Sequence, residues 1–128
     1  MQVTSSSSSS SKVQITKFED ILSWQKAFKL SEDVYREMKS CKDYGFRDQI
    51  QRSVVSIMNN IAEGYERQSN KDFAHFLYIA KGSCGETRSM VLLGAKLGYI
   101  SAENQNKYYN ELTETAKLLS GLIKKLSL

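Results

Sequence analysis

The chain has 128 residues, of which 41% are hydrophobic and 25% charged, and its 18 Lys+Arg against 14 Asp+Glu give a formal net charge of +4. This length suits one domain, and the composition is typical of a globular protein rather than a disordered one. No run approaches the ~20 apolar residues of a membrane span, and the start has no apolar secretion signal. We therefore expect a cytoplasmic protein with no membrane partner. The mild basic excess permits nucleic-acid partners, but it equally fits solubility and complementation of helix termini.

Residues 1–15 are predicted to form a flexible tail, and residues 16–128 the folded domain. The uninterrupted serine run from Ser5 to Ser11 is too polar to pack. It is also compatible with a linker or a start-site artefact. No segment shows convincing two-residue alternation over the length of a strand, so no strand is expected.

The first helix is predicted over residues 18–40. Thr16 and Glu19 have the spacing of a capping box, in which two side chains satisfy early helix N–H groups. Beyond this box the mostly apolar positions recur at steps of three and four: Ile21, Trp24, Phe28, Ser31, Tyr35 and Met38. This spacing is typical of an amphipathic helix.

The second helix is predicted from about Phe46 to Glu66, and it carries three rows of side chains. Two rows are apolar: Ile50, Val54, Ile57 and Ile61 in the first, and Val55, Met58, Ala62 and Tyr65 in the second, about 100° away. The third row is polar: Gln49, Arg52, Ser56, Asn60, Glu63 and Arg67. An ordinary surface helix needs one apolar face. Two apolar rows favour burial in the core and also against another subunit.

The third helix is predicted from an N-cap at Ser69 to about Leu97. Its middle contains Gly82, Ser83 and Gly85, although each glycine costs ~1 kcal/mol relative to alanine inside a helix. We expect the compensation to be the close approach of a neighbouring helix. A catalytic glycine loop is disfavoured because no strand precedes these residues.

Gly98 is a plausible helix stop, and Ser101 is a plausible N-cap for a fourth helix. This last helix has apolar positions at helical spacing: Tyr108, Leu112, Ala116, Leu119, Ile123 and Leu126. Four long amphipathic helices with short connections predict an all-α fold. The expected architecture is an antiparallel up-down-up-down four-helix bundle.

Short motifs in these helices occur in a characteristic order. They are Phe18-Glu19-Asp20-Ile21 with Trp24-Gln25-Lys26-Ala27, Gln49-Ile50-Gln51-Arg52-Ser53, Asn60-Ile61-Ala62-Glu63-Gly64, Phe76-Leu77-Tyr78-Ile79-Ala80 with Gly82-Ser83 and Glu86, and Leu97-Gly98-Tyr99-Ile100-Ser101. In combination they resemble the "four helix bundle protein" family, also called 23S rRNA-intervening-sequence proteins. The resemblance covers roughly residues 18–126.

The resemblance implies a bundle that assembles into a homo-oligomeric ring, with a pentamer favoured. It also implies a link to RNA, because members are encoded within insertions in the large-subunit rRNA gene. A related branch comprises accessory variability determinants of diversity-generating retroelements, which bind a reverse transcriptase and nucleic acid. The family often has a proline where this chain has Met58, so the second helix should be straighter here.

The polar row of the second helix supplies the structural candidates. Antiparallel packing of the second and third helices would place Glu86 about one turn from Arg52, which favours an ion pair. Alternatively, Arg52 faces the ring interior or an RNA phosphate. Asn60, Glu63 and Arg67 are expected to form local hydrogen bonds and subunit contacts. The complete set of structural or interface candidates is Trp24, Gln49, Asn60, Glu63, Gly64, Tyr65, Gly82 and Glu86.

Nothing in the sequence indicates an enzyme, a cofactor or a metal. His75 is the only histidine, and the Glu-x-x-His motif of di-iron bundles is absent. Cys41 and Cys84 are well separated and are expected to be free thiols. We therefore predict no catalytic, cofactor-binding or metal-binding residues and identify no small-molecule substrate.

The basic side chains supply the candidates for nucleic-acid binding: Arg47, Arg52, Arg67, Lys71, Lys81, Arg88, Lys124 and Lys125. Tyr99, Tyr108 and Tyr109 would stack on bases in a single-strand binder, although core or interface roles are more usual. No established nucleic-acid-binding motif organises these residues, so binding should be led by the phosphate backbone. The first hypothesis is a non-enzymatic ring that binds RNA or a ribonucleoprotein. The alternative is a protein-interaction scaffold, such as a reverse-transcriptase accessory protein.

Overall fold

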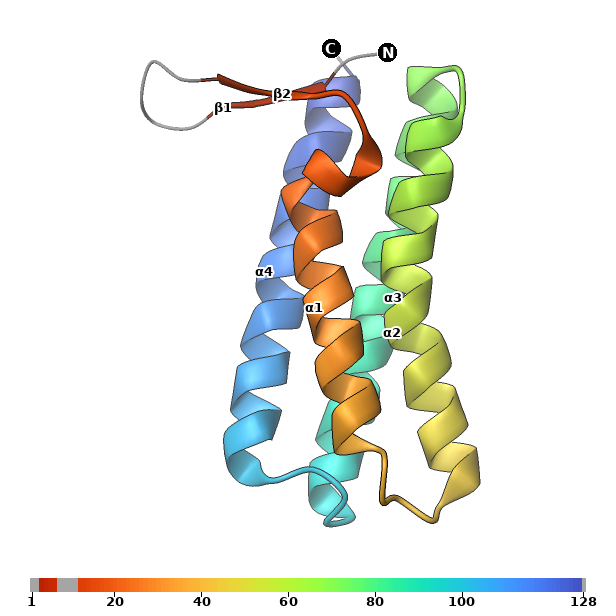
Figure 1. The fold of residues 1–128 in the computed structure, drawn as a ribbon, viewed down its shortest axis with the longest axis vertical. Helices are drawn as coiled ribbons and strands as arrows, with labels where there is room; N and C mark the ends of the chain where they lie inside the picture. Colours follow the sequence, from red (N-terminus) through yellow and green to blue (C-terminus); the bar gives the residue numbers. More distant parts are fainter. Residues whose placement is uncertain (1–2, 7–11, 128) are drawn as a thin grey trace.

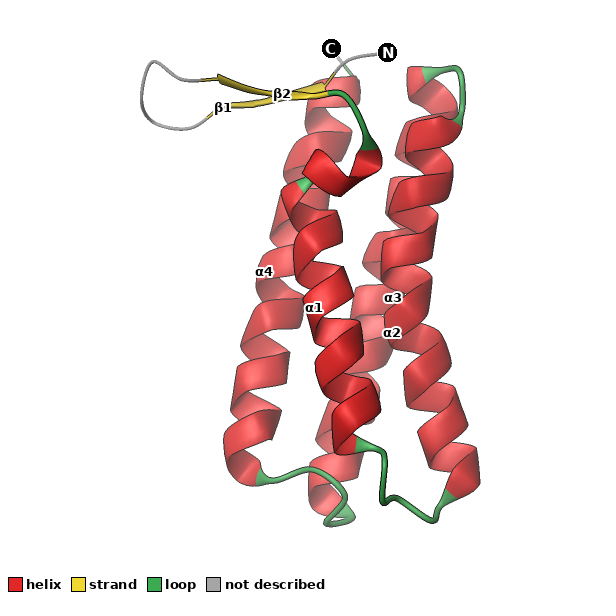
Figure 2. Ribbon diagram, in the orientation of Figure 1, coloured by secondary structure: helices red, strands yellow, loops and turns green. Residues whose placement is uncertain are grey.

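The structure is a computed structural model that describes residues 3–6 and 12–127, and four long helices dominate it (Figures 1 and 2). The elements in chain order are β1 (Val3–Ser6), β2 (Lys12–Ile15), the 3-10 turn η1 (Phe18–Asp20), α1 (Leu22–Glu37), α2 (Tyr44–Glu66), α3 (Asn70–Lys96) and α4 (Ala102–Leu126). The chain reverses direction at each connection between helices (Figure 1). The predicted four-helix domain is confirmed.

A short hairpin precedes the bundle. Val3–Ser6 pairs antiparallel with Lys12–Ile15, with Val3 opposite Ile15. The expectation that the chain contains no strand is wrong for these eight residues, whereas the flexibility of the tail over residues 1–15 stays a prediction. Ile15, which is only 2% exposed, also belongs to the core. The alternation in Lys12–Ile15 spans four residues, too few to stand out as a strand pattern. Most of the serine run, residues 7–11, lies outside the described residues.

The start of α1 differs from the predicted capping box. The backbone N–H and the hydroxyl of Thr16 both donate to the Asp20 carboxylate, at 3.1 and 3.2 Å, whereas Glu19 takes no part. These hydrogen bonds hold the pKa of Asp20 below its usual range. The chain forms a single 3-10 turn and then becomes extended at Ile21, so the helix proper begins only at Leu22.

The other helix boundaries follow local capping chemistry. Asp43 accepts a hydrogen bond from the Phe46 N–H at 3.1 Å, so α2 begins at Tyr44, two residues earlier than predicted. The predicted caps at Ser69 and Ser101 are confirmed, because each side chain accepts a backbone N–H at 3.1 Å. Gly98 has a φ of +82°, which favours glycine and ends α3 at the expected place.

The core lies between all four helices. The first apolar row of α2, beginning at Ile50, is completely buried, whereas every member of the second row, beginning at Val55, is only half-buried. Around the bundle, α1 packs on α2 and α4, and α3 packs on the same two helices. The outer faces of α1 and α3 are therefore on opposite sides of the bundle. The single chain leaves the second row of α2 incompletely covered.

Two glycines allow helices to pack closely, but not the two that the sequence singled out. A Cβ at Gly64 of α2 would lie 2.8 Å from the Phe76 Cβ of α3, and one at Gly94 would lie 2.7 Å from the Phe46 ring. At Gly82 nothing lies within 4 Å, and at Gly85 only an Arg88 nitrogen lies at 3.9 Å. The prediction of a close helix approach at Gly82 and Gly85 is wrong within this chain.

Candidate nucleic-acid interface

The polar row of α2 forms a hydrogen-bonded seam with α3. Gln49 donates to the Glu86 carboxylate at 3.3 Å, and the hydroxyls of Ser56 and Ser83 lie 2.9 Å apart. The predicted Arg52–Glu86 pair is therefore wrong. Arg52 lies three residues beyond Gln49, so its side chain is turned by about 60° away from α3 and towards the outer face of α2.

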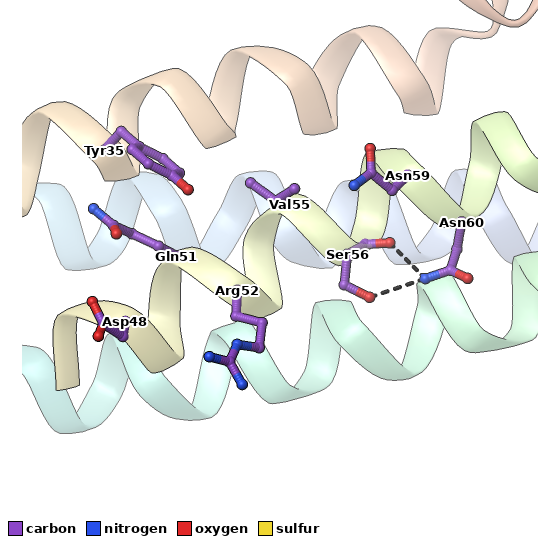
Figure 3. A pocket seen from close by; sticks show the side chains of 8 residues that line it. All are labelled: Tyr35, Asp48, Gln51, Arg52, Val55, Ser56, Asn59 and Asn60. Atoms are coloured by element: carbon purple, nitrogen blue, oxygen red, sulfur yellow. Dashed lines mark hydrogen bonds between the residues drawn. The ribbon is translucent and has the colours of Figure 1, made fainter. Parts of the chain in front are cut away.

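Arg52 lines an open groove of about 530 Å³ on the outer side of α2. The full lining is Tyr35, Asp48, Gln51, Arg52, Val55, Ser56, Asn59 and Asn60 (Figure 3). Arg52 is exposed, and no ion pair or hydrogen bond within the described part of the chain involves its guanidinium. Asp48 in the same groove offsets the charge of Arg52. The groove therefore offers a polar surface with no net positive charge.

The remaining candidates at the α2–α3 end of the bundle make local contacts. Asn60 donates to the Ser56 carbonyl at 2.8 Å, and Arg67 forms an ion pair with Glu63 at 2.9 Å. The Arg67 guanidinium also lies 4.8 Å from the centre of the Phe76 ring. The predicted local hydrogen bonding is confirmed, whereas the predicted subunit contacts stay a prediction.

The two aromatic candidates pack within the chain. Trp24 of α1 stacks on Phe28 at 5.0 Å between ring centres and meets Phe18 edge-on at 5.3 Å. Tyr65 of α2 lies edge-on to Phe73 of α3 at 5.9 Å. Both residues remain half-buried, so each contributes to the surface as well as to the core.

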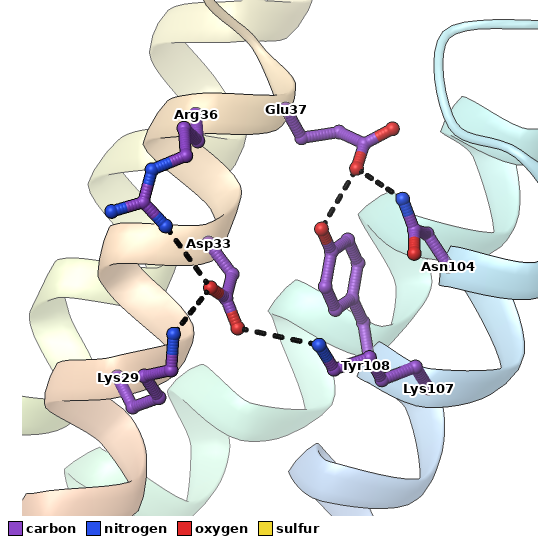
Figure 4. Close-up of polar contacts among 7 residues, drawn as sticks. All are labelled: Lys29, Asp33, Arg36, Glu37, Asn104, Lys107 and Tyr108. Carbon is purple, nitrogen blue, oxygen red and sulfur yellow. Dashed lines mark hydrogen bonds and ion pairs between the residues drawn. The ribbon is translucent and has the colours of Figure 1, made fainter.

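A polar cluster joins α1 to α4 (Figure 4). The Tyr108 hydroxyl and the Asn104 amide each donate to the same Glu37 oxygen at 2.7 Å. One turn away, three cations surround the Asp33 carboxylate at 3.0–3.9 Å: Lys29, Arg36 and Lys107. Burial, together with the hydrogen bond to Glu37, raises the pKa of Tyr108. This tyrosine is held inside the bundle and cannot stack on a base.

The three tyrosines that the sequence grouped together are separated in the structure. Tyr99 packs edge-on against Phe46, and its hydroxyl donates to Asp43 at 2.8 Å. Tyr108 is 4% exposed, whereas Tyr109 is 37% exposed. The Arg88 guanidinium lies 5.7 Å from the centre of the Tyr109 ring. Only Tyr109 of this group keeps a ring available to a ligand.

Three of the predicted basic residues come together, and they lie between α3 and α4. Lys81 of α3 and Lys124 of α4 line one groove of about 300 Å³, together with Tyr78, Ser120, Ile123 and Ser127. Arg88 lies seven residues from Lys81 and contacts α4 through the Thr113 hydroxyl at 3.4 Å. Seven residues are about two helical turns, so Lys81 and Arg88 share a face of α3.

Sequence reasoning missed one member of this cluster. Lys117 is exposed, and it precedes Lys124 by seven residues on α4, so the two share a face as Lys81 and Arg88 do. The shared seven-residue spacing was the signal that could have identified it. We call these four residues, Lys81, Arg88, Lys117 and Lys124, the basic strip.

The neighbouring carboxylates point away from the basic strip. Glu86 of α3 is bonded to Gln49 of α2, and Glu114 of α4 forms an ion pair with Lys26 of α1 at 3.3 Å. Glu111 lies three residues before Glu114, close to the α1-facing side of α4. None of the residues that line the α3–α4 groove is acidic. Positive charge therefore accumulates on this face, which is the farther side of the bundle in Figure 1.

The other basic candidates lie apart from the basic strip. Arg47 lies in the first turn of α2, where its guanidinium is 4.6 Å from the centre of the Tyr44 ring and 3.8 Å from the Asp48 carboxylate. Lys71 is exposed in the first turn of α3. Lys125 is exposed on α4, about 100° around the helix from Lys124. Together with Arg52 and Arg67, these residues do not form a second cluster.

No group of three or more His, Cys, Asp or Glu side chains that could hold a metal occurs among the described residues. Both cysteines are free, and burial raises the pKa of the Cys84 thiol to about 12, so it stays protonated near neutral pH. Across residues 3–6 and 12–127, no helix is long and apolar enough to cross a membrane.

Comparisons with known proteins agree with this architecture. Residues 19–121 match the family model of the 23S rRNA-intervening sequence protein. A crystal structure of a protein with unknown function from Bacteroides thetaiotaomicron, assigned to the S23 ribosomal protein family, is 31% identical and superimposes with a TM-score of 0.75. That match covers 80% of this chain and 99% of the other. No curated protein matches significantly. This chain belongs to the 23S rRNA-intervening sequence protein family.

Proposed function

We propose that this protein is a non-enzymatic, ring-forming bundle of the cytoplasm that binds RNA or a ribonucleoprotein through the basic strip. The observation that carries the proposal is the run of four cations between α3 and α4, from which neighbouring carboxylates are turned away. Such a surface attracts phosphates without selecting a sequence.

The distribution of charge supports the basic strip over the other surfaces of the bundle. The ammonium groups of Lys81, Lys117 and Lys124 make no ion pair or hydrogen bond with any described residue. By contrast, Arg67 is neutralised by Glu63, and Lys107 lies beside Asp33. Cations that have no carboxylate partner in the folded chain are the ones best placed to bind phosphates.

Assembly would strengthen this weak electrostatic surface. The second apolar row of α2 is only half-buried in one chain, which supports its burial against another copy. A ring of five chains would multiply the formal charge of +4 to about +20. Several basic strips on one particle would also bind one RNA by avidity.

The test measures the affinity of the whole protein for a mixed-sequence RNA oligonucleotide by fluorescence anisotropy. We expect affinity to fall steeply with salt, and Lys81→Glu with Lys124→Glu to weaken binding about ten-fold or more. Lys39→Glu with Lys42→Glu is the matched control, because it makes the same charge change on two exposed residues after α1. Binding that ignores salt, or that falls equally in the control, would overturn the proposal.

A second candidate is a protein-interaction scaffold, including a reverse-transcriptase accessory role. The observation that favours it is the apolar outer face of α3, where Ile79 and Leu93 are 40% and 47% exposed, and Leu97, which follows the last residue of the helix, is 50% exposed. Exposed apolar surface of this kind is typical of protein contacts. A reverse transcriptase gene and template repeat beside this gene would favour the scaffold, whereas a location within an rRNA gene would disfavour it.

A further inference from the structure

The α3–α4 groove combines the basic strip with two exposed tyrosine rings. Tyr78 is 61% exposed at the groove that Lys81 and Lys124 line, and it is the most exposed large hydrophobic side chain among the described residues. At the other end of the strip, Tyr109 is 37% exposed. The strip is therefore flanked by an aromatic ring at each end.

The spacing of these groups follows from helix geometry. Tyr78 lies ten residues before Arg88 on α3, about 15 Å along the helix axis. Arg88 contacts Tyr109, so the two rings are separated by at least two helical turns, with cations between them. An extended polyanion lying along the groove would meet a ring, several positive charges and then a second ring.

No contact with another described residue explains the exposure of Tyr78. A tyrosine whose ring is mostly exposed contributes little to the core, and no hydrogen bond with another described residue involves its hydroxyl. The surrounding serines, Ser120 and Ser127, add hydroxyl groups to the groove, and Ile123 adds apolar surface. An aromatic ring that protrudes beside lysines is the arrangement that binds a base by stacking and its phosphate by charge.

We infer that the groove binds single-stranded RNA, with unpaired bases stacking on Tyr78 and Tyr109 while Lys81, Arg88, Lys117 and Lys124 bind the phosphates. A duplex presents phosphates but keeps the faces of its bases inside, so the tyrosines could not contribute to binding it. This inference rests on the proposed RNA binding and adds the kind of strand and the two stacking residues.

The experiment compares four variants of the whole protein by anisotropy, each with a single-stranded RNA and with the corresponding duplex. Tyr78→Leu and Tyr109→Leu should each weaken single-strand binding by about ten-fold, because stacking on an aromatic ring is lost. Tyr78→Phe should bind like the unaltered protein, because phenylalanine keeps the ring. Tyr44→Leu is the control, since Tyr44 is 58% exposed at the start of α2 and lies outside the groove.

The outcomes separate this inference from the proposed function. The inference is supported if the protein binds the duplex more weakly than the single strand, if both leucine variants lose affinity for the single strand, and if Tyr78→Phe retains it. Duplex binding as tight as single-strand binding, or unchanged binding by both leucine variants, would overturn it. If the stacking inference is overturned in this way but the double variant Lys81→Glu with Lys124→Glu loses affinity for RNA, backbone-led RNA binding stands and only the stacking inference fails. If that protein also binds normally, both fail.

Discussion

At Gly64 the smallest side chain lets α2 and α3 approach closely. An alanine there would place its Cβ 2.8 Å from the Phe76 Cβ and 3.2 Å from the Phe73 carbonyl oxygen, so the helices would have to separate. We expect Gly64→Ala to lower the free energy of unfolding by about 1–3 kcal/mol, as overpacking does. Urea denaturation followed by circular dichroism measures it, and an unchanged midpoint would contradict the close approach.

Gly82 provides the opposite case on the outer face of α3. Nothing lies within 4 Å of a Cβ there, so Gly82→Ala should raise the free energy of unfolding by about 0.5–1 kcal/mol through helix propensity alone. The same denaturation experiment measures the gain. A loss of stability would instead show that another chain packs against this part of α3 in the assembled protein.

Asp43 makes stability depend on pH. The Phe46 N–H, and then the Tyr99 hydroxyl, donate to its carboxylate and hold its pKa below the usual range. The unfolded chain therefore binds a proton at higher pH than the folded one, so this stabilisation is present above about pH 4 and is lost as pH falls through the folded pKa. Asparagine can still cap the helix but has no carboxyl to protonate. In Asp43→Asn the free energy of unfolding should therefore fall less between pH 5 and pH 2 than in the unaltered protein. An identical pH profile for the two proteins would contradict this role.

At the scale of elements, α1 and α4 are joined by the cluster around Glu37. Tyr108→Phe removes a 2.7 Å hydrogen bond to a carboxylate in a largely buried place, so we expect a loss of about 1.5–3 kcal/mol in the free energy of unfolding. Tyr109→Phe is the control, because that neighbouring ring is exposed. Thermal unfolding of both variants measures the difference. Equal stability would show that the Tyr108 hydrogen bond contributes little.

Periodicity predicted the four helices because apolar side chains at steps of three and four must face a core. The caps at Ser69 and Ser101 were also predictable, since each depends on atoms within one turn. The hairpin was not, because four residues of alternation are too short to detect. Gly64 and Gly82 look alike in sequence, and only the packing of α3 shows which one is crowded.

The candidate site was less predictable than the fold because it combines two helices. The sequence named Lys81, Arg88 and Lys124 among eight basic residues, but it did not distinguish them from Arg67, whose charge Glu63 neutralises. Lys117 was missed although its spacing repeats that of the others. The expected Arg52–Glu86 pair does not form, because Gln49 faces Glu86 of α3 and Arg52, three residues later on α2, is turned by about 60° away from it.

The whole molecule combines three features: a half-buried apolar row on α2, an exposed apolar face on α3 and a basic strip between α3 and α4. The apolar surfaces lie on different parts of the bundle, so a contact between them would be heterologous, and such contacts close into rings when the rotation allows. The basic strip would then repeat around the ring. Assembly and RNA binding are in this way parts of one proposal.

Size-exclusion chromatography of the untagged protein at low salt tests this proposal most directly, with light scattering for mass and absorbance at 260 and 280 nm for nucleic acid. We predict a particle of several chains, with a mass near five chains favoured, and an excess of absorbance at 260 nm that RNase removes. A stable monomer with a clean protein spectrum would contradict both the ring and the binding of RNA.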